Sequence, residues 1–169
     1  IALTRQSVLD VSGNGGGTIT LAGDDISNAG LIQANAGDNA TAGSISVIAQ
    51  NLLTLESTSK IVASGARTNS SGGTIYLYSY GDTVARAGQV IDISGGSVSG
   101  DGGSAEFSAH GTATFDGTVI GSAAPGYRIG TLSIDPVNAN VNGTISANTT
   151  VWAQEDITVQ GNVTINSGI

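Results

Sequence analysis

Gly73-Thr74-Ile75-Tyr76-Leu77 is one copy of a motif that returns along the chain and decides its fold. In each copy a glycine precedes a short segment in which apolar residues alternate with other residues, as in a β-strand with one buried face. The copies begin at Gly17, Gly43, Gly73, Gly103 and Gly130. Their spacings of 26, 30, 30 and 27 residues indicate one structural unit stacked on copies of itself.

A second apolar motif keeps the same period and stays in phase with the first. It reads Ile32-Gln33-Ala34, then Ile61-Val62-Ala63, then Ile91-Asp92-Ile93. Between the two motifs of one cycle lies a third short segment, Thr83-Val84-Ala85. Three strands per cycle, separated by turns rich in Gly, Asn, Asp and Ser, predict an all-β fold, a parallel β-helix (β-solenoid) with about 28 residues per coil.

Alignment of the cycles predicts which side chains form the core. The first inward column contains Ile19, Ile45, Ile75, Ala105 and Leu132. The second inward column of the same strands contains Leu21, Val47, Leu77, Phe107 and Ile134. A β-sandwich does not repeat its sequence in this way, and a propeller blade needs about 40–50 residues per repeat. The repeat therefore favours the β-helix over both.

The sequence divides into two parts with different patterns. Residues 1–136 carry the regular coils. Residues 137–169 contain short strand-like segments without the glycine motif, and we expect them to continue the β-helix in a changed register, truncated at the end of the chain. Because the chain opens at Ile1, we take it as a processed chain or a fragment, so that the lack of a targeting segment carries no information.

The composition of the chain argues against several kinds of partner and several kinds of site. Thirteen acidic and five basic residues give a net charge of −8, which argues against nucleic acid and against an anionic membrane surface. No apolar run is long enough to span a bilayer, so we expect no membrane insertion. The chain has no Cys, which excludes disulfides and thiolate metal sites.

The chain resembles a known family in three places. These are the Gly-Gly-x-Ile-x-Leu strands, the segment 130–136 (Gly-Thr-Leu-Ser-Ile-Asp-Pro), and the run from Asn148 to Val159. Together they resemble the filamentous haemagglutinin family, the secreted exoproteins of bacterial two-partner secretion. The resemblance implies a right-handed β-helix that is exported and serves as an adhesin or related surface protein. The family's secretion domain is absent from this sequence, which would correspond to the passenger region.

Candidate catalytic residues are few. The single histidine, His110, lies in a turn, and the five basic residues are spread along the chain. A polysaccharide-active β-helix enzyme needs clustered carboxylates, often with Ca²⁺ and a basic group, so an enzyme is the lowest of the alternatives. Gly100-Asp101-Gly102-Gly103 resembles part of a calcium-binding repeat but never completes it. We expect no catalytic residue, no metal and no cofactor.

Two surface features are candidates for contact with partners. Tyr76, Tyr78 and Tyr80 alternate with inward residues and should share one outward face, with Ile48 beside Tyr78 in the neighbouring coil. The alternative is a ladder of side chains covered by a turn or by another copy of the protein. The second feature is a set of Asn-x-Ser/Thr sites for glycosylation at Asn39, Asn69, Asn142, Asn148 and Asn162, a number that chance alone produces in such a composition.

These patterns lead to a functional hypothesis. The chain is expected to be a non-enzymatic extracellular rod at the bacterial cell surface, an adhesin-like passenger whose partner is a glycan or protein of a host or neighbouring cell. The alternative is a structural subunit of an extracellular filament or matrix, in which copies join end to end through their open coil edges.

Overall fold

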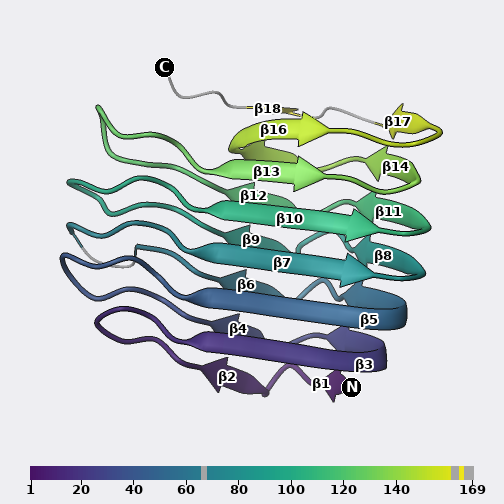
Figure 1. The fold of residues 1–169 in the computed structure, drawn as a ribbon, viewed down its shortest axis with the longest axis horizontal. Helices are drawn as coiled ribbons and strands as arrows, with labels where there is room; N and C mark the ends of the chain where they lie inside the picture. Colours follow the sequence, from purple (N-terminus) through teal and green to yellow (C-terminus); the bar gives the residue numbers. More distant parts are fainter. Residues whose placement is uncertain (66–67, 161–163, 166–169) are drawn as a thin grey trace.

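The computed structural model describes residues 1–65, 68–160 and 164–165. Within these residues the chain forms strands, turns and loops, without a helix, and the strands of successive coils pair in parallel. Figure 1 shows the coils stacked from the N-terminus to the C-terminus as a β-solenoid. The near strands run to the right, the far strands return to the left, and the chain rises, so the solenoid is right-handed. The predicted fold class is confirmed.

Each coil contributes to three faces. The first face contains β3 (Thr18–Asn28), β5 (Ser44–Leu55), β7 (Thr74–Ser79), β10 (Ser104–Ala109), β13 (Thr131–Ile134) and β16 (Asn148–Val151). The second contains β1 (Ala2–Leu3), the later halves of β3 and β5, and β8 (Asp82–Ala85), β11 (Thr112–Phe115), β14 (Asn138–Val141) and β17 (Ile157–Val159). The third contains β2 (Val8–Asp10), β4 (Leu31–Gln33), β6 (Lys60–Val62), β9 (Val90–Asp92), β12 (Thr118–Ile120), β15 (Thr144–Ser146) and β18 (Thr164–Ile165).

Two coils differ from the expected three separate strands. β3 and β5 run without a break from the first face onto the second, with a register shift between Gly23 and Asp25 where β3 pairs with β5. In the next coil a turn at Tyr80-Gly81 separates β7 from β8. The first two faces therefore form one continuous 11-stranded sheet, and the third face is a separate 7-stranded sheet.

The predicted columns of the first face form part of the core, together with inward residues of the other two faces. Strand pairing places Ile45 opposite Ile19 on one side and Ile75 on the other, and the column continues through Ala105 and Leu132. All five side chains are buried. Burial of one such Ile or Leu contributes about 1.5–3 kcal/mol, and the repeat multiplies this contribution along the rod.

The second column has one large side chain that meets another across the interior. Phe107 follows Val47 and Leu77 in this column and is fully buried. Its ring lies 5.3 Å from that of Phe115 on the second face, edge to face at 77°. Leu21, in the lowest coil of the column, is only partly buried.

Loops between the third and the first face project to one side and stack on one another. This loop stack comprises the described residues of 34–43, 63–73, 93–103 and 121–130 (Figure 1, left). Backbone hydrogen bonds join successive loops, for example from Asn39 N–H to Asn69 C=O at 2.6 Å and from Gly102 N–H to Arg128 C=O at 2.8 Å. The loops therefore extend the parallel ladder beyond the three faces.

The recurring glycine lies where each loop returns to the first face. The N–H of Gly73 donates to the carbonyl of Ala63 at 2.8 Å and closes the base of its own loop, and the carbonyl of Gly73 accepts the N–H of Ser104 at 2.9 Å from the next coil. Gly43 and Gly103 make the same two kinds of bond. A Cβ on Gly73 would collide with the Gly43 carbonyl, and one on Gly103 with the Gly73 carbonyl. This glycine ladder lets the coils approach backbone to backbone.

The coil formed by β13, β14 and β15 is shorter than the coil before it. Leu132 pairs with Thr149, 17 residues further on, whereas Ala105 pairs with Leu132, 27 residues further on. The difference arises because β15 ends at Ser146 and β16 begins at Asn148, so no loop joins the loop stack there. β14 to β18 remain paired to the coils before them wherever the structure describes them.

Inside the corner before the third face, one polar side chain is buried without a partner. Gln89 has no exposed surface, and neither its Nε2 nor its Oε1 makes a hydrogen bond. The equivalent residue of the preceding coil, Ser59, receives a hydrogen bond from Asn28 at 2.7 Å. Gln89 instead lies against Gly117, which leaves room for its side chain.

Substitution of Gly73 by Ala should lower the free energy of unfolding by about 1–3 kcal/mol, because the new methyl group collides with backbone that belongs to a ladder. Thermal and denaturant unfolding would measure the loss. Gly15→Ala is the matched control, since a Cβ there meets no atom within 4 Å. An equal effect of the two substitutions would contradict the role of the glycine ladder.

Gln89→Met should raise the free energy of unfolding by about 1 kcal/mol, because it removes two buried groups without partners at nearly constant volume. Denaturant titration would measure the change. Gln33→Met serves for comparison, since Gln33 Nε2 donates to Asp10 at 2.7 Å and its removal should bring no gain. A clear loss of stability in Gln89→Met would show that the amide has a partner.

Candidate functional site

The three predicted tyrosines lie together at the outer surface of β7 and the turn that follows it. Tyr76 and Tyr78 are partly exposed and Tyr80 is 56% exposed, whereas Ile75 and Leu77, on either side of Tyr76, are fully buried. The strand alternation expected from the sequence is therefore the one observed. We call Tyr76, Tyr78 and Tyr80 the tyrosine strip.

The rings of the tyrosine strip contact one another. Those of Tyr76 and Tyr78 are stacked, with centroids 5.9 Å apart and planes inclined by 13°. Tyr80 meets Tyr78 edge to face at 5.0 Å and 86°. Such contacts restrict the side chains before any partner binds, which lowers the entropy cost of binding.

The residues that flank the tyrosine strip are of two kinds. Ile48, partly exposed, pairs with Tyr78 from the coil below, as expected. Glu106 pairs with Tyr76 from the coil above. Burial raises the pKa of the Tyr76 hydroxyl, and the nearby Glu106 carboxylate raises it further, so this phenol stays neutral and can donate a hydrogen bond at physiological pH.

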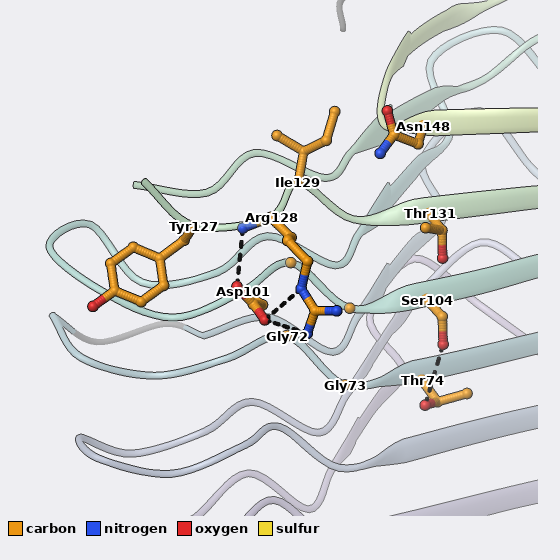
Figure 2. Close-up of a pocket in the computed structure, with 12 residues that line it drawn as sticks. Gly72, Gly73, Thr74, Asp101, Ser104, Tyr127, Arg128, Ile129, Thr131 and Asn148 are labelled. Atoms are coloured by element: carbon orange, nitrogen blue, oxygen red, sulfur yellow. Dashed lines mark hydrogen bonds and ion pairs between the residues drawn. The ribbon is translucent and has the colours of Figure 1, made fainter. Parts of the chain in front are cut away.

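A groove runs along the first face beside the tyrosine strip. Its first part is a hollow of about 600 Å³ between the loop stack and the start of the strands, and its second part, of about 460 Å³, lies over the strands themselves and reaches Tyr76 and Glu106. The two parts share four lining residues, Thr74, Ser104, Thr131 and Asn148. Figure 2 shows three of these side chains, Thr74, Ser104 and Thr131, one above another on successive strands.

The wall of the groove on the loop side contains an ion pair. Arg128 donates from Nε and Nη2 to Oδ2 of Asp101 at 3.0 and 2.7 Å, and its backbone N–H donates to Oδ1 at 2.9 Å (Figure 2). These bonds, that of the backbone first, hold the pKa of Asp101 below its usual range. The pair joins two adjacent loops of the loop stack. The Arg128 guanidinium is largely exposed at the edge of the groove.

Sequence reasoning missed this groove, because its wall comes from loops and its floor from outward strand positions. One signal was available: Asp101 and Arg128 have opposite charges and lie 27 residues apart, which is one coil. Tyr127, 45% exposed at the edge of the hollow, was also not predicted as part of a site.

The glycosylation sites do not form one surface. Asn39 and Asn69 lie in successive loops of the loop stack, where Asn39 is exposed with a positive φ of 59° and Asn69 accepts a hydrogen bond from Ser99 at 3.0 Å. Asn142 is exposed and donates to Asp116 at 3.1 Å, and Asn148 is exposed in the groove. Asn162 lies outside the described residues.

The acidic side chains mostly join adjacent coils. Counting bonds between described residues, seven of the thirteen bond to a residue of a neighbouring coil: Asp10, Asp38, Glu56, Asp82, Asp101, Asp116 and Glu155. His110 is exposed in the turn between β10 and β11. Among residues 1–65, 68–160 and 164–165, no three His, Asp or Glu side chains are grouped so that they could hold a metal ion.

Comparisons with known proteins add no identity. No protein-family model, no curated protein and no solved structure matches the chain. The resemblance to the filamentous haemagglutinin family therefore stays a prediction. In the described part of the chain, no helix has the length and apolar character needed to cross a membrane.

Asp101→Asn should loosen the loops 93–103 and 121–130, measured as faster amide hydrogen exchange at neutral pH. Because the folded state lowers the pKa of Asp101, its stabilising effect is present above the pKa of an unfolded aspartate and is lost as pH falls through the lowered value. The difference from the unchanged protein should therefore vanish in acid. Asp24→Asn, at an exposed position of β3, is the control and should change exchange at neither pH. Equal exchange in both variants would contradict the assigned role of the ion pair.

Proposed function

We propose that this chain is a non-enzymatic β-helical rod that acts as an adhesin-like passenger at the bacterial cell surface. The observation that carries the proposal is the first face, where prearranged tyrosine rings lie beside a groove with a hydroxyl-rich floor. Tyrosine offers apolar area and a hydroxyl at low cost in conformational entropy, which suits contact with glycans and proteins. The regular stack beneath it supplies a rigid support.

The arrangement of the two carboxylates in the groove supports a binding role over catalysis. A glycosidase places two carboxyl groups about 5–10 Å apart across its substrate. In the groove, Asp101 is bonded to Arg128, and Glu106 accepts a hydrogen bond from Ser108 at 3.0 Å. These two carboxylates belong to different parts of the groove, one at the loops and one over the strands. A polysaccharide-active enzyme remains the lowest alternative.

A structural filament is the second candidate, and one observation favours it. The last described coil carries exposed apolar side chains at positions that continue the inward columns, Ile157 at 51% and Val159 at 60%. Stacking of one rod on another would bury them in the same way as the internal columns. Sedimentation over a range of protein concentrations separates the two functions, since an adhesin rod keeps its size whereas a filament subunit grows.

Replacement of both Tyr76 and Tyr78 by Ser should leave the melting temperature within a few degrees of the unchanged protein, since no inward residue is altered, and should abolish adhesion of protein-coated beads to cultured cells. The matched control is Leu52→Ser with Val84→Ser, which removes outward apolar side chains from the second face. Normal adhesion of the tyrosine variant, or failure of beads carrying the unchanged protein to adhere, would contradict the proposal.

A further inference from the structure

The groove beside the tyrosine strip repeats along the rod in a way that restricts its ligand. Its floor presents Thr74, Ser104, Thr131 and Asn148, which are exposed and occupy the same position on four successive strands, β7, β10, β13 and β16. The next outward position presents Tyr76, Glu106, Ser133 and Thr150 in the same register. Two parallel rows of polar groups therefore run along the rod axis with the coil spacing of about 4.8 Å.

A ligand that uses every copy of this floor must itself repeat at the coil spacing. An extended peptide advances about 3.3 Å per residue, or about 6.6 Å from one side chain to the next on the same side, and falls out of step within two coils. In a straight, equatorially linked polysaccharide, one pyranose ring and its glycosidic oxygen span close to one coil, and because successive rings are turned over, the same ring edge recurs at close to every second coil. Such a chain can place one sugar over each strand from β7 to β16.

The chemistry of the lining fits a neutral sugar chain. Hydroxyl and amide groups on the floor both donate and accept hydrogen bonds, as sugar hydroxyls do. The backbone of Gly72, Gly73, Gly102 and Gly103, which carry no side chains, also lines the hollow. The charges there are Asp101 and Arg128, which compensate one another, and Glu106, and the net charge of −8 disfavours a polyanion. The ring faces of the tyrosine strip at the far side suit the apolar C–H faces of pyranoses.

We infer that the groove binds an extended, neutral, β-1,4-linked polysaccharide lying along the rod axis, with about one sugar per coil from Thr74 to Asn148. This inference rests on the proposed function and names its ligand class. The hydroxyl rows hold the sugar hydroxyls, and Tyr76 lies under the ring at the lower end. Glu106 accepts hydrogen bonds from the chain rather than cutting it.

Calorimetric titration of the unchanged protein with neutral β-1,4-linked oligosaccharides of glucose, mannose, xylose and N-acetylglucosamine tests the inference. For at least one of them affinity should rise with chain length up to about four sugars and then level off, because the floor spans four strands. The α-1,4-linked glucose hexamer, which curves, and the anionic galacturonate hexamer should bind at least about tenfold more weakly. Equal or tighter binding of either, or no binding of any neutral oligosaccharide, overturns the inference.

Variants then place the site. Thr74→Val and Thr131→Val should each weaken the binding of the preferred hexamer by about tenfold, because each removes hydrogen bonds at nearly constant shape. Thr18→Val is the control, since Thr18 is exposed in the same row but two coils below Thr74. Equal binding by all three variants would show that the oligosaccharide binds elsewhere, and would overturn the inference. If the protein adheres to cells through Tyr76 and Tyr78 but binds no oligosaccharide, only the ligand class is overturned. If the unchanged protein neither adheres to cells nor binds an oligosaccharide, the proposed function is overturned as well.

Discussion

The close approach of one backbone to the next at the glycine ladder is the constraint on which the rest of the structure depends. Because no Cβ fits between the Gly43 and Gly73 backbones, or between those of Gly73 and Gly103, the coils meet there at full hydrogen-bonding contact. The same glycines close the base of each loop and fix where the first face begins. They thereby set the register of the inward columns, the alignment of each loop with the next, and the position of the groove between the loops and the strands. A repeat that first looks like a preference for glycine is therefore a steric requirement.

The core could be predicted from the sequence because two periods coincide there. Strand alternation selects Ile75 and Leu77 as inward residues, and the coil repeat places Ile45 and Val47 against them, as the structure confirms. The merging of two strands in β5 could not be predicted, since Ala49-Gln50-Asn51 gives no sign of whether the corner breaks the ladder. The groove could not be predicted either, because its wall depends on how loops of similar length stack beside a face. Gln89 shows a third limit: the same corner holds a bonded Ser59 in one coil and an amide without a partner in the next.

The charged side chains have a different role from the one that composition suggests. Thirteen acids scattered along a chain look like a means of solubility, yet several act across coils: Asp38 accepts the N–H of Thr68, Asp82 that of Thr112, and Glu56 pairs with Arg86. Each such bond joins residues about one repeat apart, so that acids in turns continue the ladder where strands end. The first face receives few of them, and that leaves its floor of hydroxyl groups nearly free of charge. Cross-coil bonding by acids and a first face with few charges are thus compatible in an acidic protein.

The direction of the hydrogen bonds has a mechanical consequence. The backbone bonds between coils and the cross-coil side-chain bonds point along the stacking axis rather than across it. A tensile force applied at the two ends would load these interfaces in series, so that one interface carries the full force and opens before the others. No loop follows β15 before β16 begins, so the interface between these two coils lacks the loop-to-loop bonds that the earlier interfaces have. A sideways force on the loop stack would instead be shared among several coils at once. The molecule is therefore built to resist a sideways force on its loops better than stretching along the stack.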